Sequence, residues 1–297
     1  IETTAHTFGA GIMDDKGNVL ANEKDSFMTE EGGMRPIEVA EHHLNEWKNV
    51  LDSALDKAGI ELKDIDLISF SQGPGLGHAL RIGAFIARSI AIKYNKAIVG
   101  VNHCLAHLSI GELRTGAKDP ILLYVSGANT QVIGYEGGKY RVFGETLDMG
   151  TGNFLDSVAR EMGLGFPGGP KIEKLAAQGE NFIDLPYTVK GMDINLGGLF
   201  SKMKQLLQRK EYSHEDLAYS IQETVFAMLI EVSERAMAHC GKNELLLGGG
   251  VACNKKLQEM CKTMCEERDG KWFVPENQFL VDNAAMIAWQ GYLEWKA

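Results

Sequence analysis

Two stretches of the chain, far apart in the sequence, share one outline. A loop of small residues at 3–7 leads into an alternating segment, a glycine-containing turn at 15–18 and a second segment that ends near residue 27. A similar loop at 125–130 leads into another such pair of segments, whose turn contains Gly137 and Gly138. Alternating segments on either side of a glycine turn are typical of a β-hairpin. The sequence therefore predicts two similar hairpins, one in each part of the chain.

Each predicted hairpin is followed by a second shared series of elements. An apolar run at 67–70 leads into a glycine-rich loop, a helix and a strand, and a later apolar run leads through residues 248–254 into the same series. This order, present twice, predicts an α/β protein of two similar lobes that face each other across a nucleotide cleft. We expect lobes at residues 1–118 and 119–297, with the last helix, residues 283–297, able to pack back on the first lobe.

Composition narrows the class of protein. The chain has 44% hydrophobic and 24% charged residues, as ordinary globular proteins do, and it lacks the run of about 18 apolar residues that predicts a membrane span. Its net charge of −10 makes it a poor candidate for binding a nucleic acid without basic partners. Five cysteines without a CxxC pair favour reduced thiols in the cytoplasm. The first residues resemble the inside of a strand, so we expect a few native residues to precede them.

Two histidines stand four residues apart where a predicted strand is followed by a helix. His103 and His107 would lie about 6 Å apart on one helix face, which lets both imidazoles reach one metal ion. The alternative is a pair of hydrogen-bonded helix histidines. Cys104 stands where the HExxH metallopeptidase motif has its glutamate, so the general base of that motif is absent. The pair is a candidate metal site without protease machinery.

A metal site needs further ligands, and two loop ends offer them. Asp282 opens the last predicted helix after the strand-like residues 278–281, where its alternative role is that of an N-cap. Tyr124 lies at the end of the predicted strand 121–125, where its alternative role is in the core. Two imidazoles, a phenolate and a carboxylate suit iron best, with zinc and magnesium as alternatives. We expect one divalent or trivalent metal ion per chain.

The loop that follows Tyr124 has the composition of a phosphate-binding loop. Successive N–H groups with little side-chain obstruction suit phosphate oxygens, although the tight start of a hairpin is an equally good interpretation. The twin loop near residue 5 offers Thr4 and His6 for the same purpose. The chain contains neither a Walker A motif nor GxGxxG, so paired hairpins would have to bind an ATP- or AMP-type nucleotide. The candidate residues in the second loop are Tyr124, Val125, Ser126, Gly127, Ala128 and Asn129.

Later segments offer candidates for the remainder of a nucleotide. Gly249 and Gly250 follow a predicted buried strand and allow a base to approach the backbone closely, with Asn254 at the end of the same loop. Asp156 lies too deep in its predicted helix to cap it, so it is a candidate for a ribose hydroxyl. Glu173 is expected in the first turn of the next helix, where its alternative role is to interact with the helix dipole.

As a set, these segments resemble the universal family of tRNA threonylcarbamoyladenosine transferases, in the archaeal and eukaryotic form found within the KEOPS complex. An older label of this family was O-sialoglycoprotein endopeptidase. The matching segments lie along essentially the whole chain, in the order of the family: ETTAHTFGAGI, GGMRPIEVAEHH, SQGPGLGHALRIG, VNHCLAHL, YVSGANTQV, GETLDMGTGNFLDSVAR, FPGGPKIEKLA, KGMDINLGGL, GGGVACNKKL and VDNAAMIAWQG.

The resemblance implies the fold shared by actin, Hsp70 and sugar kinases (the ASKHA fold), with duplicated ribonuclease-H-like lobes. It implies transfer of a threonylcarbamoyl group from threonylcarbamoyl-AMP to the exocyclic amine of the adenosine beside the tRNA anticodon. By position, the metal ligands of the family match His103, His107 and Asp282, and that of its archaeal and eukaryotic branch matches Tyr124. The phosphate loop matches Ser126, Gly127 and Ala128, and the positions around ribose and base match Asp156, Gly169, Glu173 and Asn254.

The resemblance also implies partners. These are a small protein kinase-like ATPase, a dimerising subunit and an accessory subunit of the KEOPS type, with tRNA bound through the complex. The early helix with Val39, His43 and Leu44 is one place for such a contact. Three alternative functions are a small-molecule kinase of the same fold, a metallopeptidase as in the older label, and a nucleotide-responsive scaffold without activity on tRNA.

Overall fold

The computed structural model describes residues 1–28 and 35–297, and these form two compact units. The first unit contains residues 1–114 and 276–297, and the second contains residues 115–275. The division thus falls after residue 114 rather than after residue 118, and the last helix belongs to the first unit. Part of the segment GGMRPIEVAEHH, residues 32–34, lies outside the described residues.

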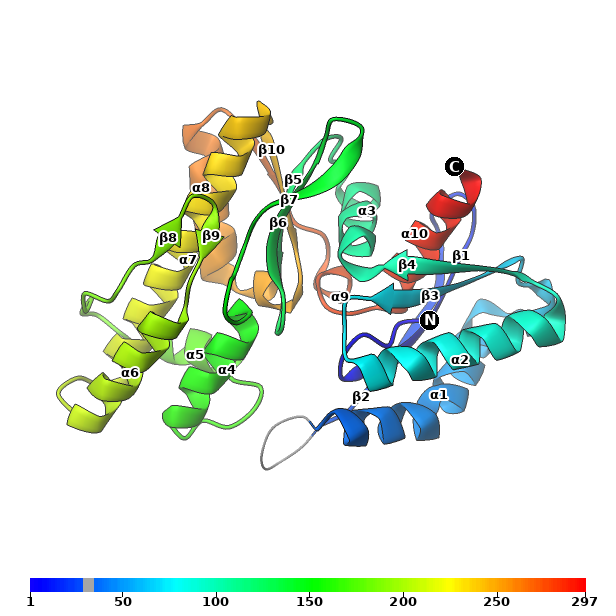
Figure 1. Ribbon diagram of the computed structural model, residues 1–297, viewed down its shortest axis with the longest axis horizontal. Helices are drawn as coiled ribbons and strands as arrows, with labels where there is room; N and C mark the ends of the chain where they lie inside the picture. Colours follow the sequence, from blue (N-terminus) through cyan, green and yellow to red (C-terminus); the bar gives the residue numbers. More distant parts are fainter. Residues whose placement is uncertain (29–34) are drawn as a thin grey trace. The chain divides into compact units, whose positions relative to one another are not determined.

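The first unit is built on a sheet whose middle is the start of the chain (Figure 1). The predicted hairpin is formed by β1 (Thr7–Met13) and β2 (Val19–Ser26), which pair antiparallel. The other two strands, β3 (Leu67–Gly73) and β4 (Ala97–Asn102), pair parallel. Residues 1–3 join the two pairs, because Glu2 bridges to Gly9 of β1 and Ser71 of β3 donates its N–H to the carbonyl of Ile1 at 3.0 Å. The strand order is therefore β4, β3, residues 1–3, β1, β2.

Helices pack on this sheet because the side chains of β1 alternate in size. Phe8, Ala10 and Ile12 point into a core with α1 (Pro36–Ala58) and α2 (Gly77–Tyr94). Gly9 and Gly11 present almost no side chain on the alternate positions, and there α10 (Ala284–Lys296) lies close to the strand. The remaining helices of this part are η1 (Leu62–Asp64), α3 (His103–Thr115) and α9 (Asn277–Leu280).

The second unit repeats this architecture. Its sheet has the order β11, β10, β5, β6, β7, with parallel pairing as far as β5 and antiparallel pairing from there on. This is the strand order of the first unit, with β5 in the place of residues 1–3, so the predicted duplication is confirmed. The strands are β5 (Ile121–Val125), β6 (Thr130–Glu136), β7 (Lys139–Glu145), β10 (Glu244–Gly248) and β11 (Lys271–Phe273).

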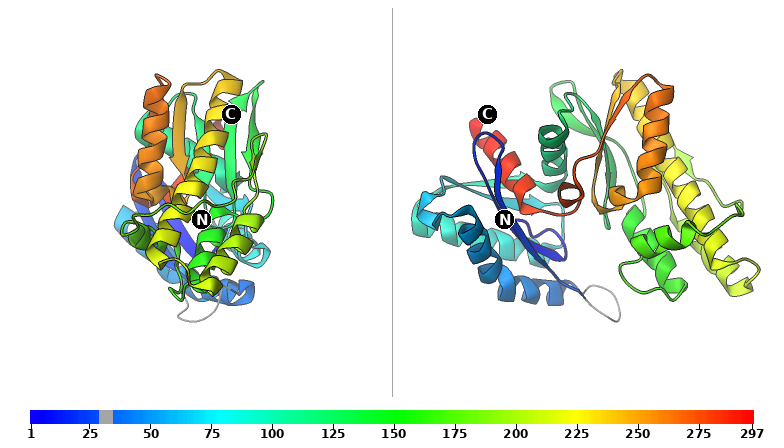
Figure 2. Two further views of the ribbon diagram at one scale, coloured as in Figure 1. Left: turned by 90° about the vertical axis from the view of Figure 1, so that its left-hand side faces the viewer. Right: turned by 180° about the vertical axis from the view of Figure 1, so that it is seen from behind.

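Two helices of the second unit, α7 (His214–Cys240) and α8 (Lys255–Glu267), lie side by side and pack against its sheet (Figure 2). Three more helices, a short 3-10 turn and a small hairpin complete the unit. They are α4 (Thr151–Glu161), α5 (Gly169–Ala176), α6 (Gly197–Arg209), the 3-10 turn η2 (Gly250–Cys253) and the strands β8 (Val189–Lys190) and β9 (Asp193–Ile194).

Two local predictions are wrong. Residues 278–281, predicted as a strand, belong largely to the short helix α9, because Phe279 and Leu280 are buried by helical packing rather than by a sheet. Val39 and His43, suggested for a partner contact, are fully buried on the inner face of α1, whereas Leu44 is exposed. Among the helices of residues 1–28 and 35–297, none combines the length and apolar character needed to cross a bilayer.

Candidate functional site

The histidine pair lies at the start of α3. Asn102, the last residue of β4, accepts hydrogen bonds from the N–H groups of Cys104 (2.9 Å) and Leu105 (3.2 Å), and this starts the helix at His103. One turn later, the His107 ring lies 4.8 Å from the His103 ring between centroids, at 78° between planes. Both residues are buried, with 2% and 1% of their surface exposed. The spacing of four residues therefore produces the predicted pair of rings on one helix face.

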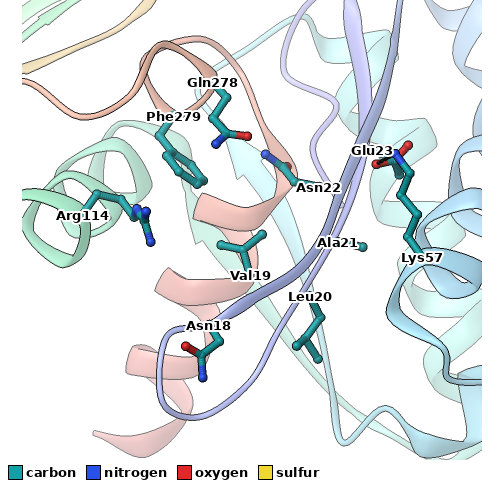
Figure 3. Close-up of a pocket in the computed structure, with 10 residues that line it drawn as sticks. All are labelled: Asn18, Val19, Leu20, Ala21, Asn22, Glu23, Lys57, Arg114, Gln278 and Phe279. Carbon is teal, nitrogen blue, oxygen red and sulfur yellow. Dashed lines mark hydrogen bonds and ion pairs between the residues drawn. The ribbon is translucent and has the colours of Figure 1, made fainter.

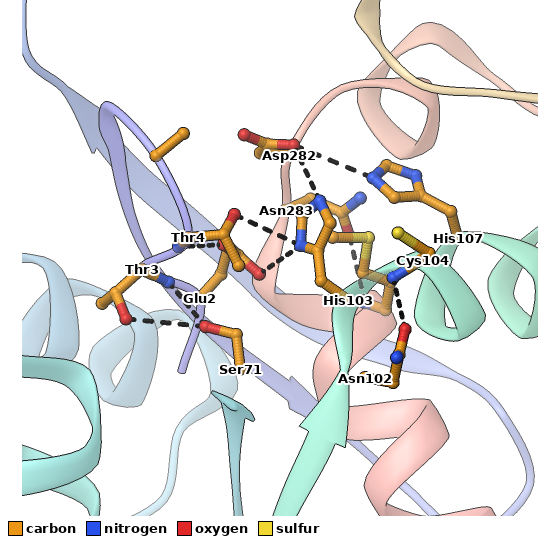
Figure 4. A network of polar contacts seen from close by, with 12 residues as sticks. Glu2, Thr3, Thr4, Ser71, Asn102, His103, Cys104, His107, Asp282 and Asn283 are labelled. Carbon is orange, nitrogen blue, oxygen red and sulfur yellow. Dashed lines mark hydrogen bonds and ion pairs between the residues drawn. The ribbon is translucent and has the colours of Figure 1, made fainter. Parts of the chain in front are cut away.

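Asp282 approaches the pair from the loop before α10. The N-cap of α10 is Asn283 rather than Asp282, because Asn283 accepts the N–H of Met286 at 3.0 Å through its side-chain oxygen. The capping alternative for Asp282 is thus wrong, and its carboxylate is available to the histidines. Its Oδ1 lies 3.4 Å from His103 Nε2 and 3.8 Å from His107 Nε2 (Figure 4).

The three side chains fit one metal ion. Their donor atoms all lie within 4.8 Å of one another. Two ligands that are each ~2.1 Å from a metal are separated by roughly 3.0–3.4 Å in octahedral or tetrahedral geometry. The 3.4 Å distance already fits, whereas the 3.8 Å distance and any longer separation of the histidine nitrogens, up to 4.8 Å, must shorten when an ion binds. Imidazole nitrogens and a carboxylate are ligands for iron or zinc, and the set does not discriminate between them. His103, His107 and Asp282 therefore form a candidate metal centre.

The charged groups of the cluster shift one another's pKa values. Burial lowers the pKa of His103, but the carboxylates of Glu2 and Asp282 outweigh it and raise that pKa to about 10. Burial also lowers the pKa of His107, and the charge of His103 adds to that effect. Burial raises the pKa of Asp282, yet hydrogen bonds from His103 and His107 hold it well below its ordinary value. Asp282 thus keeps its negative charge beside the two rings, which favours a cation between them.

Glu2 is the residue of this site that the sequence did not suggest. Its side chain is fully buried, and its Oε2 lies 3.0 Å from Nδ1 of His103, on the side of the ring away from Asp282. Thr4, predicted as a phosphate contact, instead donates both its N–H and its hydroxyl to Oε1 of Glu2, each at 2.5 Å. Thr4 therefore supports Glu2, and its phosphate role stays a prediction. His6 is partly buried beside it, and its phosphate role stays a prediction.

Tyr124 and the loop after it belong to the second unit. Tyr124 is 1% exposed at the end of β5, as its core alternative predicts, and its metal-ligand role stays a prediction. Ser126 closes the loop by donating its N–H to the carbonyl of Asn129 at 2.8 Å. Gly127 and Ala128 are exposed, and within the described residues their N–H groups have no hydrogen-bond partner. Two adjacent exposed N–H groups are what an anion-binding loop requires.

The remaining nucleotide candidates gather near the starts of α5 and α8. Asp156 accepts the N–H of Gly168 at 2.7 Å, beside Gly169. Glu173 lies in the second turn of α5 rather than the first, and it accepts the N–H of Lys255 at 2.7 Å instead of interacting with the dipole of its own helix. Asn254 caps α8 and donates to the side chain of Gln222 at 2.9 Å. These residues are brought together, but each has a structural role, so their contacts to a nucleotide stay predictions.

Gly249 and Gly250 follow β10 as predicted. Gly249 has a φ of 90°, and a Cβ at this position would lie 2.3 Å from the carbonyl oxygen of Val125. Only glycine therefore lets this loop approach the end of β5 so closely. The loop also brings Asn254 to the first turn of α8, where the base contact was predicted.

A separate hollow of about 500 Å³ opens on the first unit (Figure 3). Its walls carry the ion pair of Lys57 with Glu23 at 2.7 Å, and none of His103, His107 and Asp282 lines it. It is thus distinct from the metal centre. Its lining residues are Asn18, Val19, Leu20, Ala21, Asn22, Glu23, Lys57, Arg114, Gln278 and Phe279.

Comparison with solved structures supports the fold predicted from the duplication. HypF of Thermococcus kodakarensis superposes with a TM-score of 0.66 at 17% identity, over 85% of this chain and 43% of that one. The activator of 2-hydroxyisocaproyl-CoA dehydratase from Clostridium difficile gives 0.59 at 14% identity, over 99% and 94%. A glucokinase of the ROK family from Streptomyces griseus gives 0.54 at 12% identity, over 99% of both chains. The chain has the ASKHA fold.

Comparison of sequences identifies a family, whereas the solved structures identify only the fold. Residues 18–289 match the TsaD family, described as tRNA N6-adenosine threonylcarbamoyltransferase. The enzyme of that name from Thermococcus kodakarensis is 58% identical over 98% of this chain and 89% of its own length. A probable bifunctional tRNA threonylcarbamoyladenosine biosynthesis protein from Methanothermobacter thermautotrophicus is 52% identical over all of this chain and 55% of its own length. The chain therefore belongs to the tRNA N6-adenosine threonylcarbamoyltransferase family.

Proposed function

We propose that the chain transfers a threonylcarbamoyl group from threonylcarbamoyl-AMP to the exocyclic amine of the adenosine beside the tRNA anticodon. The observation that carries this proposal is the relationship over nearly the full length to enzymes named for that activity, at up to 58% identity. The site adds chemical support, since a mixed anhydride of a carbamate with AMP is already activated. Such a donor needs orientation and charge stabilisation rather than a strong nucleophile from the protein.

His103, His107 and Asp282 would hold the metal ion. With the phenolate of Tyr124 as a fourth ligand the set would favour iron, with zinc or magnesium as alternatives. When bound, the ion would supply Lewis acidity toward an oxygen of the donor and a fixed point for its orientation. Burial of both rings supports this role, because it keeps water away from the ligand atoms. Tyr124 completes the ligand set in our proposal, through the phenolic oxygen at the end of β5.

The second unit would bind the nucleotide part of the donor. The exposed N–H groups of Gly127 and Ala128 suit the phosphate, whose charge grows as the acyl group departs. Solved structures with the same fold include HypF in a phosphate- and nucleotide-bound form and the dehydratase activator with bound ADPNP, which is compatible with an ATP- or AMP-type ligand here. The other contacts we propose are Val125, Ser126, Asn129, Asp156, Gly169, Glu173, Gly249, Gly250 and Asn254.

Partners of the KEOPS type would bring the tRNA to this acidic chain. The net charge of −10 disfavours direct binding of RNA, so basic surfaces must come from other proteins. The bifunctional relatives contain a further part of about half their length, which supports a pathway with several components. We propose a small protein kinase-like ATPase, a dimerising subunit and an accessory subunit, acting in the cytoplasm. Buried cysteines and the lack of a disulfide within the described residues are compatible with that compartment.

The alternative activities have weaker support. A metallopeptidase would need a general base one residue after His103, and the buried thiol of Cys104 occupies that place with its pKa raised to about 12 by burial. A small-molecule kinase is suggested only by fold, because the glucokinase neighbour is 12% identical. Neither activity is named among the relatives at 50–58% identity.

Reconstitution tests the proposal. The protein would be incubated with threonine, bicarbonate, ATP, an adenylate-forming enzyme, the three partner subunits and tRNA, and the digested nucleosides analysed by mass spectrometry. We expect threonylcarbamoyladenosine with the wild type and a loss of at least about 100-fold in its rate of formation with His107→Ala, since removing a ligand removes most of the metal-dependent stabilisation. An equal yield with His107→Ala would refute the metal-dependent mechanism. No modified nucleoside with the wild type would refute the activity.

A further inference from the structure

Glu2 is a buried acid whose two carboxylate oxygens both have polar partners. Its side chain is 0% exposed, and both of its carboxylate oxygens are used. Oε1 accepts the N–H and the hydroxyl of Thr4, and Oε2 lies 3.0 Å from Nδ1 of His103. A buried carboxylate is costly unless such partners satisfy it, so this position has a definite role.

The backbone holds Glu2 rigidly in this place. Its N–H donates to the carbonyl of Gly9 at 3.0 Å, and its carbonyl accepts the N–H of Gly9 at 2.9 Å. On the other side, Thr3 donates its N–H to the hydroxyl of Ser71 in β3 at 2.9 Å. The backbone of Glu2 is thus fixed between two strands of the first unit, with its carboxylate directed at Thr4 and His103.

The contact with Glu2 determines which nitrogen of His103 carries hydrogen. A carboxylate only accepts hydrogen bonds, so Nδ1 donates to Glu2 and keeps its hydrogen, and a metal ion that binds His103 displaces hydrogen from Nε2 alone. Nε2 is the atom that faces Asp282 Oδ1, at 3.4 Å, and it belongs to the candidate metal centre. Carboxylates that orient a metal-binding histidine through its other nitrogen increase metal affinity and fix the ring.

We propose that Glu2 is a positioning residue, which holds His103 in the Nδ1–H form so that Nε2 binds the metal ion. Thr4 supports Glu2 by occupying Oε1 with two donors, which leaves Oε2 for the histidine. This inference rests on the metal centre of the proposed function, but it concerns a residue outside the ligand set.

The substitution Glu2→Gln tests the proposal sharply. Because the N–H of Thr4 must still find an acceptor, the side-chain oxygen of the introduced glutamine would remain at Thr4 and its amide nitrogen would face His103. An amide nitrogen donates, so Nδ1 of His103 would have to accept and hydrogen would move to Nε2. The metal-binding nitrogen would then be blocked. Ser71→Ala is the matched control, because it removes a contact of the same segment without touching Glu2 or His103.

Two measurements on the full chain test whether Glu2 positions His103. Titration with Co²⁺ against a chelator should show at least about 10-fold weaker binding for Glu2→Gln and a change below about threefold for Ser71→Ala. Nitrogen NMR of ¹⁵N-histidine-labelled protein loaded with Zn²⁺ should show a protonated Nδ1 at His103 in the wild type. Loss of hydrogen from Nδ1 of His103 in metal-free Glu2→Gln, with hydrogen retained on Nε2, would support the mechanism directly.

Failure of the role of Glu2 and failure of the metal centre would give different results. If Glu2→Gln binds Co²⁺ as the wild type does while His103→Ala loses binding, the metal centre stands and the role of Glu2 is refuted. If the wild type binds no Co²⁺, or His103→Ala binds it equally well, the metal centre fails and the inference with it. If Glu2→Gln does not fold, the NMR of the wild type alone decides, because a protonated Nε2 at His103 in the Zn²⁺-loaded protein contradicts the proposal.

Discussion

Gly11→Ala should disturb the metal centre through the start of α10. A Cβ at this position would lie 2.4 Å from the backbone nitrogen of Ala285 and 2.5 Å from the backbone carbon of Ala284. Both atoms belong to the first turn of α10, which directly follows Asp282 and Asn283. The new methyl group cannot turn away, since it meets backbone on the helix and is itself fixed to β1.

The size of the effect follows from these distances. Carbon atoms attract at about 3.5 Å, so relieving a contact of 2.4 Å requires the start of α10 to move by roughly 1 Å. Overpacking of this kind costs about 1–3 kcal/mol, and the movement also breaks the hydrogen bond from Ala285 N–H to the side chain of Asn22. Metal sites tolerate deviations of only about 0.2 Å in ligand distance. We therefore expect about 2–3 kcal/mol of destabilisation together with at least about 10-fold weaker metal binding.

Thermal unfolding and Co²⁺ titration would measure the two effects. At about 2–4 °C per kcal/mol for domains of this size, Tm should fall by about 4–12 °C. Gly9→Ala is the matched control on the same strand, because its Cβ would lie 3.2 Å from the Cβ of Ala284 and 3.4 Å from the backbone. Its effect on both readouts should be much smaller. A Gly11→Ala protein with wild-type Tm and wild-type Co²⁺ affinity would refute the link between this packing and the site.

Three further predictions concern a cap, the metal and pH. Asn283→Ala removes the acceptor for Met286 N–H and the donor to the carbonyl of Val281, and it should lower the free energy of unfolding by about 1–2 kcal/mol in urea. Zn²⁺ at 100 times its Kd should stabilise the wild type by about 2.7 kcal/mol, and no such rise in Tm should occur with His107→Ala. Hydrogen bonds from Asn181 and Glu180 lower the pKa of Asp216 to about 2, so its contribution to stability is present above its ordinary value of 3.8 and is lost as pH falls through about 2. The stability gap between wild type and Asp216→Asn should therefore close as pH falls, and a constant gap in urea midpoints would contradict this.

The hairpins and the helix ends could be predicted because local residues decide them. Pro36 begins α1 and Gly59 ends it with a φ of 68°, as expected from their conformational preferences. The short helix α9 could not be predicted, because four residues are too few to show a period that separates helix from strand. The place of residues 1–3 in the sheet was equally hidden, since they pair with β1 on one side and with β3, about seventy residues away, on the other.

Prediction of the site was limited in the same way, because only local patterns can be read from the sequence. The spacing of His103 and His107 indicates a shared face, because helical geometry alone brings them together. Asp282 and Asn283 are both favoured N-cap residues, so only the register of α10 reveals which one caps and which one reaches the histidines. Glu2 had no local signal, because its partner His103 stands 101 positions further along the chain. Residues that act through another residue are the ones a sequence pattern conceals most completely.

The two twin loops of the duplication differ in the hydrogen-bond partners of their N–H groups. Each loop leaves the central strand of its sheet and passes a glycine that comes close to the backbone: Gly75 beside the carbonyl of Thr4, and Gly249 beside that of Val125. In the first unit the N–H groups of Thr3 and Thr4 are already bound, to Ser71 and Glu2. In the second unit Gly127 and Ala128 keep exposed N–H groups that no described residue occupies. One copy of the repeat therefore uses the N–H groups of Thr3 and Thr4 to bind its own chain, whereas the other copy keeps two exposed N–H groups, as an anion-binding loop requires.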